Sequence, residues 1–154
     1  MIGTPLPPFA LLDHLGATVT NASLAGHWTV LYAYPKDSTP GCTTEACDFR
    51  DNWARVQALG ARVYGISRDN AKSHQNFIAK QSLPFPLLSD PETTLLKPLG
   101  AFGKKVMYGK EMEGIIRSTF LIDPTGVIRH VWPKVSVKGH VEAVLKVLET
   151  LNRP

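Results

Sequence analysis

The chain has 154 residues, of which 44% are hydrophobic, and its formal net charge is +4. This length suffices for one compact domain with its own core, so we expect a single domain over residues 1–154. Its two cysteines are too few for a secreted disulfide framework, and its scattered basic residues argue against nucleic-acid binding.

The sequence also lacks the signals of membrane insertion or export. It has no run of roughly 18 apolar residues, and its first residues are not a basic region followed by an apolar segment. We therefore expect a cytoplasmic protein without a membrane span.

The first predicted elements form a short hairpin, a strand, a helix and a second strand. The hairpin covers residues 9–20, and the β-branched and aromatic segments 28–34 and 61–67 have strand length. Between these strands, apolar residues recur at three- and four-residue steps up to Gly60, a suitable C-terminal cap, and they are Ala46, Phe49, Trp53, Val56 and Leu59. A strand-helix-strand unit favours a parallel pair with a right-handed crossover.

The second half of the chain predicts a similar alternation. We expect a helix over 70–81, a short strand within 83–90, a short helix within 91–100, and a loop or frayed strand over 101–114. A hairpin then joins 115–123 to 127–135, with Pro133 suggesting an edge position or a bulge, and an amphipathic helix covers 139–151. The assembled elements predict an α/β fold, in which a central mixed sheet is flanked by helices and extended by an amino-terminal hairpin.

Both cysteines lie within YPKDSTPGCTTEACDFRD, residues 34–51. Thr39 is a suitable N-cap and Pro40 suits the first helical position, so Cys42 falls in the first helical turn. There the unpaired backbone N–H groups and the positive end of the helix dipole favour a thiolate. This pattern indicates a reactive thiol, which also needs donors beside the sulfur to stabilise charge during a reaction.

The spacing of Cys42 and Cys47 constrains what the second thiol can do. Five residues along an ideal helix separate the two Cα atoms by about 8 to 9 Å, whereas a disulfide needs less than about 7 Å. A transient disulfide therefore requires the first turns to unwind, and a sulfenic acid on Cys42 would condense readily with such a thiol. Alternatively, Cys47 is a buried small hydrophobe.

The segment from Pro35 to Cys42 fits the P-x-x-x-[TS]-x-x-C signature of peroxiredoxins, and PKDSTPGCTTEACDFRD closely resembles the peroxiredoxin Q subgroup, also called bacterioferritin comigratory proteins. VYGISRD, SHQNF, FPLLSDP, MYGK and RSTFLID follow in the expected order, so the resemblance extends from about Pro5 to Leu148. It implies a thioredoxin-like fold with an amino-terminal extension. It also implies a thiol peroxidase for hydrogen peroxide and organic hydroperoxides, with neither cofactor nor metal.

The resemblance assigns a role to each matching residue. Cys42 matches the peroxidatic cysteine and Cys47 the resolving cysteine of the intramolecular, or atypical, two-cysteine arrangement. Thr39 matches the hydroxyl that hydrogen-bonds the peroxide, Pro35 the residue that shields the pocket from water, and Arg117 the arginine that stabilises thiolate and peroxide. The implied reductant is thioredoxin or a similar dithiol donor, and the implied state is a monomer.

Each of these residues also has a structural interpretation. Thr39 could be only a helix cap, Pro35 a turn residue and Arg117 a surface arginine on a strand. Glu45, one turn after Cys42, either braces the site or is a solvated helix residue.

Two other functions fit parts of the sequence. A thioredoxin-type oxidoreductase normally has the C-x-x-C spacing, which differs from the spacing here. A copper-binding protein on the same fold would use both cysteines and a distant histidine such as His130 or His140, since thiolates and imidazole suit Cu(I).

Overall fold

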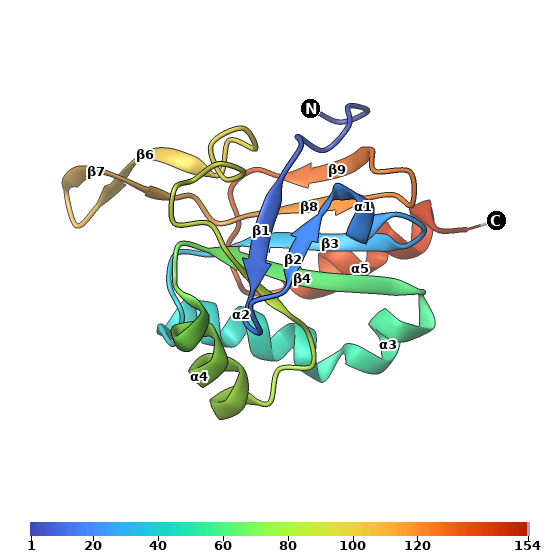
Figure 1. Cartoon of the computed structure of the whole chain (residues 1–154), viewed down its shortest axis with the longest axis horizontal. Helices are drawn as coiled ribbons and strands as arrows, with labels where there is room; N and C mark the ends of the chain where they lie inside the picture. The colour runs from blue at the N-terminus through green and yellow to red at the C-terminus, as the bar shows by residue number, and fades with distance from the viewer. Residues whose placement is uncertain (154) are drawn as a thin grey trace.

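The computed structural model describes residues 1–153 and contains a seven-stranded mixed sheet, with strand order β2-β1-β5-β4-β3-β8-β9 (Figure 1). The strands of this sheet are β1 (Ala10–Asp13), β2 (Thr18–Thr20), β3 (Trp28–Ala33), β4 (Ala61–Ser67), β5 (Leu87–Ser89), β8 (Ser118–Ile122) and β9 (Ile128–Trp132). The helices are α1 (Asn21–Leu24), α2 (Pro40–Asp51), α3 (Trp53–Ala58), α4 (Ala71–Gln81) and α5 (His140–Leu151).

The centre of the sheet is parallel and its outer strands are antiparallel. β3 pairs in parallel with β4, and β4 pairs in parallel with β5, whereas β8 and β1 run antiparallel to their neighbours β3 and β5. The predicted mixed sheet, the parallel pair and the amino-terminal hairpin β1–β2 are therefore confirmed. Every residue of β3 is buried, which explains why its sequence shows no polar alternation.

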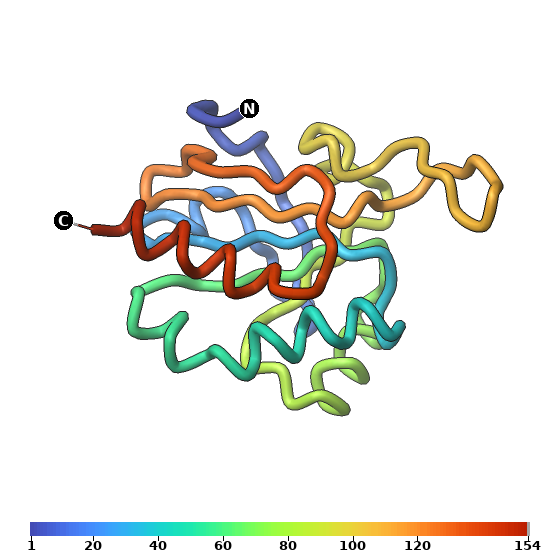
Figure 2. Tube along the Cα trace, turned by 180° about the vertical axis from the view of Figure 1, so that it is seen from behind, coloured from blue at the N-terminus to red at the C-terminus, as the bar shows by residue number. Residues whose placement is uncertain are grey.

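Two hydrophobic cores cover the two faces of the sheet. One core joins β3 to the helices α2, α3, α4 and α5 through buried side chains that include Val30, Phe49, Val56, Phe77 and Leu145. The other core lies under α1 and the turns that follow β5, and it includes Leu24, Leu31, Leu95, Leu96 and Phe120. Figure 2 shows α5 and α2 running across the same side of the strands.

Two helix predictions need correction. The helix expected to continue to Leu59 is interrupted at Asn52, whose side chain donates to the Asp48 carbonyl at 2.8 Å, and α3 begins after it. Residues 91–100 form hydrogen-bonded turns and no regular helix. There the Asp90 carboxylate accepts hydrogen bonds from the backbone N–H groups of Thr94, Leu95 and Leu96. In a regular helix these groups would donate to backbone carbonyls four residues earlier.

The segment expected as a loop or frayed strand over 101–114 is a paired hairpin. β6 (Phe102–Met107) and β7 (Lys110–Ile115) form their own two-stranded sheet. Tyr108 and Gly109 connect them with φ values of 54° and 75°, as a two-residue turn with two left-handed positions requires. The hairpin projects from the body of the molecule in both views of the chain (Figures 1 and 2).

The remaining elements agree with prediction within a few residues. Asn70 caps α4 by accepting from the Ser73 N–H at 2.9 Å, and β9, the edge strand, ends directly before Pro133. No helix within residues 1–153 has both the length and the hydropathy needed to cross a bilayer.

Candidate active site

Cys42 lies in the first turn of α2, as the sequence predicts. Thr39 is the N-cap residue, Pro40 begins the helix, and the Cys42 side chain is buried. The Thr39 hydroxyl makes no capping bond and instead donates to the Lys36 carbonyl at 2.7 Å. The lone pairs of this hydroxyl therefore stay available to accept a hydrogen bond from a ligand.

Arg117 reaches the Cys42 sulfur from the connection between β7 and β8. Its Nη2 lies 3.3 Å from Cys42 Sγ and its Nη1 donates to Glu45 Oε1 at 2.7 Å. A Cβ on Gly41 would lie 3.2 Å from Arg117 Nη2, so the missing side chain at this position makes room for the guanidinium. The Arg117 side chain is only 16% exposed, so the interpretation as a surface arginine is wrong.

Glu45 is the buried carboxyl partner of Arg117. Its side chain is fully buried, which rules out the interpretation as a solvated helix glutamate. Burial raises its pKa to about 7, although the neighbouring Arg117 charge acts in the opposite direction. Burial alone would lower the pKa of Arg117, but the charges of Glu45 and Cys42 outweigh it and raise that pKa above its usual value.

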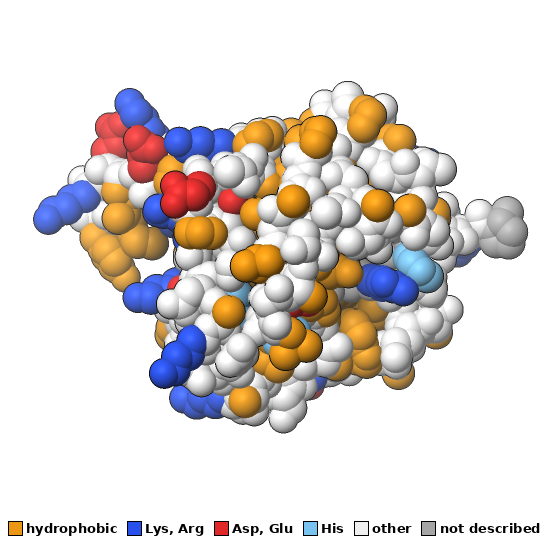
Figure 3. Space-filling model, viewed as in Figure 1, with side chains coloured by type: hydrophobic (Ala, Val, Ile, Leu, Met, Phe, Trp, Pro, Cys, Tyr) orange, Lys and Arg blue, Asp and Glu red, His pale blue; other side chains and the backbone are white. Residues whose placement is uncertain are grey.

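A pocket of about 700 Å³ opens onto Cys42. Pro35, Thr39, Cys42 and Arg117 line one side of it, and the hairpin contributes further lining residues that include Lys105, Met107, Tyr108 and Met112. Sequence reasoning missed this contribution, although GKKVM and KEMEG flank Tyr108-Gly109 as segments of equal length, a signal of a two-residue hairpin. Figure 3 shows hydrophobic side chains gathered on the projecting hairpin.

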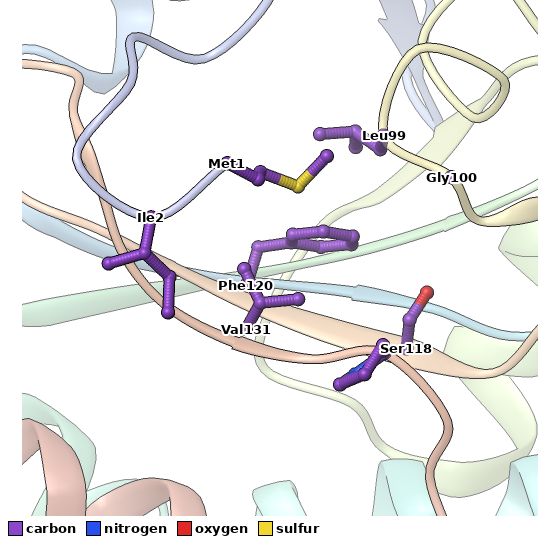
Figure 4. Close-up of a pocket in the computed structure, with 8 residues that line it drawn as sticks. Met1, Ile2, Leu99, Gly100, Ser118, Phe120 and Val131 are labelled. Carbon is purple, nitrogen blue, oxygen red and sulfur yellow. The ribbon is translucent and has the colours of Figure 1, made fainter.

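A separate hollow of about 590 Å³ lies elsewhere on the molecule, lined by side chains that include Met1, Ile2, Leu99, Phe120 and Val131 (Figure 4). Its lining includes neither cysteine, nor Arg117. We therefore place the candidate active site in the pocket at Cys42.

Cys47 lies on the same unbroken helix as Cys42, and both thiols are free. Its Sγ is half-buried and donates to Gln81 Oε1 of α4 at 3.5 Å. Because α2 is regular over both positions, the calculated Cα separation of about 8 to 9 Å applies to this state.

The residues suggested for copper binding are engaged separately from the cysteines. His140 Nε2 lies 2.8 Å from Thr119 Oγ1, and burial lowers its pKa to about 4, while His130 packs against Trp132 with 4.3 Å between ring centroids. Within residues 1–153, the one group of three potential metal ligands combines Asp37, Asp69 and His74 and contains neither cysteine.

Comparison with known proteins gives consistent matches over almost the whole chain. Residues 2–131 match the model of the AhpC/TSA family. The chain is 48% identical over 144 residues to a putative peroxiredoxin Bcp of Coxiella burnetii, covering 94% of this chain and 95% of that protein. It is 44% identical over 151 residues to peroxiredoxin Bcp of Bacillus subtilis, covering 98% and 96%.

Solved structures agree with these matches. Xanthomonas campestris peroxiredoxin Q superposes with a TM-score of 0.89 at 46% identity, covering 94% of this chain and 92% of that one. A second structure, with the same TM-score, identity and coverage, concerns the alkyl peroxide reduction activity of the bacterioferritin comigratory protein of that organism. Fold and sequence thus agree with the resemblance carried by the cysteine motif, and the chain belongs to the AhpC/TSA family, as a thiol peroxidase of the peroxiredoxin Bcp, or peroxiredoxin Q, group.

Proposed function

We propose that the protein reduces hydrogen peroxide and organic hydroperoxides through a sulfenic acid on Cys42, which Cys47 resolves as an intramolecular disulfide. The observation that carries this proposal is the 3.3 Å contact between Arg117 Nη2 and Cys42 Sγ in the first turn of α2. A permanent cation and the helix N-terminus act together on this sulfur, and both favour the nucleophilic thiolate.

In the first step the Cys42 thiolate attacks one peroxide oxygen. The S–O bond forms as the O–O bond breaks, and the departing oxygen takes a proton to leave as water or an alcohol. Arg117 donates to the peroxide oxygens, where negative charge develops. The Thr39 hydroxyl, whose hydrogen is directed to Lys36, accepts from the peroxide O–H, and Pro35 limits the access of water.

In the second step the Cys47 thiolate attacks the Cys42 sulfur. The S–S bond forms as the S–O bond breaks, and the released hydroxide takes a proton to become water. The first turns of α2 must unwind for this step, because the helical separation exceeds the reach of a disulfide. Gln81 must also release the Cys47 thiol.

The cycle closes when a dithiol protein reduces the disulfide by thiol exchange, and we propose thioredoxin or a similar donor for this role. We further propose that the chain acts as a single-domain monomer in the cytoplasm, where dithiol proteins are kept reduced. It would need neither a cofactor nor a metal, since sulfur carries the two-electron chemistry.

Stopped-flow tryptophan fluorescence of the reduced protein mixed with hydrogen peroxide tests the proposal, with half-buried Trp53 of α3 as the reporter. A second-order rate several decades above that of a free thiolate, absent in Cys42→Ser, is the expected result. A rate close to that of a free thiolate would contradict the peroxidase function.

A further inference from the structure

Behind the cysteine motif lies a group of buried polar side chains that the proposed mechanism does not use. Asp37, in the middle of the segment 35–39, is 6% exposed, and its carboxylate has three partners. It accepts from Tyr34 Oη at 2.5 Å and from Ser73 Oγ at 2.8 Å, and it lies 2.7 Å from His74 Nδ1. Ser73 and His74 belong to the first turn of α4, so this carboxylate ties the segment to that helix.

The hydrogen bonds of His74 fix its orientation. Its side chain is fully buried, and its Nε2 lies 3.1 Å from the Leu88 carbonyl oxygen. Because a carbonyl oxygen only accepts, Nε2 carries a hydrogen. With Nδ1 in contact with Asp37 at the other side of the ring, the histidine bridges the segment 35–39 to β5.

The backbone of the same segment is held as well. The Asp37 N–H donates to Asp69 Oδ2 at 2.9 Å, and Ser67 Oγ at the end of β4 donates to the same oxygen at 2.7 Å. We call Asp37, Asp69, Ser73 and His74 the Asp37 clamp. It fixes the chain two residues before Thr39, with only Ser38, in the left-handed conformation at φ 62°, in between.

We propose that the Asp37 clamp positions the Thr39 hydroxyl in the pocket that it shares with Cys42 for the peroxide reaction, so that Asp37 and His74 are positioning residues for the first catalytic step. The hydroxyl donates within its own segment, to the Lys36 carbonyl, so its place in the pocket depends on what holds that segment. The inference rests on the proposed peroxidase function. It adds that side chains of α4 and at the end of β4, two elements without a cysteine, affect the rate constant of the first step.

Two substitutions of His74 separate the positioning contact from the rest of the histidine. Asparagine carries its amide nitrogen at the δ position, so His74→Asn retains a donor for Asp37 and loses the bond to Leu88. Glutamine carries the amide at the ε position, so His74→Gln retains the bond to Leu88 and loses the contact with Asp37. The two variants are therefore matched controls for each other.

The measurement compares two reactions of the reduced proteins. The first is the second-order rate with hydrogen peroxide, and the second is alkylation of Cys42 by iodoacetamide, followed by peptide mass spectrometry. Alkylation requires the Cys42 thiolate but does not involve the Thr39 hydroxyl. We expect His74→Gln to lower the peroxide rate at least about tenfold and His74→Asn less than about threefold, since a displacement near 1 Å can cost up to about a hundredfold. Alkylation should change less than about twofold in both.

A double substitution tests whether the effect passes through Thr39. Thr39→Val already lacks the hydroxyl, so adding His74→Gln to it should lower the peroxide rate less than about threefold further. If the full loss reappears in this background, the clamp acts by another route and the proposal is overturned.

Other outcomes also decide against it. Equal losses of peroxide rate in the two His74 variants, no loss in either, or a parallel fall in alkylation would each overturn the proposal. If His74→Gln does not fold by circular dichroism, Ser73→Ala removes one donor from Asp37 with little effect on burial. It should slow the peroxide reaction at least about threefold with alkylation unchanged, and an unchanged peroxide rate would reject the inference. A slow peroxide reaction in the unsubstituted protein would reject the peroxidase function itself.

Discussion

Glu45→Gln should remove a pH dependence from the stability of the protein. Burial raises the Glu45 pKa from 4.5 to about 7, a difference of about 2.5 units. At about 1.4 kcal/mol per unit, this amounts to about 3 kcal/mol. A carboxyl group whose pKa is higher in the folded than in the unfolded state does not reduce the free energy of unfolding at pH values below the unfolded pKa. Its stabilising proton is lost as the pH rises through the folded pKa, so stability falls between pH 4.5 and about 7.

The assay is urea denaturation of the reduced protein and of Glu45→Gln at several pH values between about 4.5 and 8.5. Glutamine has the same shape, still accepts a hydrogen bond from Arg117 and does not titrate. The contributions of all other titrating groups therefore cancel when the unfolding free energies of the two proteins are subtracted. The free energy of unfolding of the unsubstituted protein should fall by about 3 kcal/mol relative to the variant across this range. Parallel pH dependences in the two proteins would refute the conclusion that a buried, proton-binding carboxyl group lies behind Cys42.

Three further substitutions test the remaining parts of the site. Arg117→Lys replaces two donor nitrogens, one on Cys42 and one on Glu45, by a single ammonium, and should slow the stopped-flow peroxide reaction about thirtyfold, or about 2 kcal/mol; a rate within about threefold would contradict the role of the planar fork. Cys47→Ser should leave the first oxidation within about twofold while abolishing the internal disulfide, as read by thiol counting and mass spectrometry; a folded variant that fails to react with peroxide would contradict the division of roles between the cysteines. Gly41→Ala would place a Cβ 3.2 Å from Arg117 Nη2, so it should displace the guanidinium and slow the peroxide reaction several-fold, while denaturation shows stability unchanged or up to about 1 kcal/mol higher because alanine favours the helix; an unchanged peroxide rate would show that the guanidinium position is not critical.

Much of the site could be predicted because its signals are local. Thr39 and Pro40 determine where α2 begins, and so they place Cys42 in the first turn without reference to the rest of the chain. Arg117 lies 75 positions from Cys42, and no local pattern identifies it. Only the resemblance to a family pointed to this residue, and the structure then brings its guanidinium to the sulfur.

The errors arose where side chains compete with backbone patterns. Asp90 takes three backbone N–H groups and turns residues 91–100 away from a helix, and Asn52 interrupts the helix that the apolar spacing predicts to continue. The hairpin β6–β7 was missed for a different reason. Ile115 is the one buried residue of these two strands, and Val106 is 74% exposed, so burial at the base of the hairpin leaves no alternating signature along the strands.

The composition of α2 has a consequence for the evolution and engineering of the protein. Its first half, Pro40 to Thr44, consists of residues with low intrinsic helix propensity apart from its helix-start proline, whereas Ala46 and Phe49 in the second half are fully buried. The backbone of the first turns is therefore easy to open, while Phe49 anchors the helix beyond Cys47. Consensus-style substitutions that strengthen the first half would raise the melting temperature and slow turnover together, so selection for heat tolerance should spare these positions.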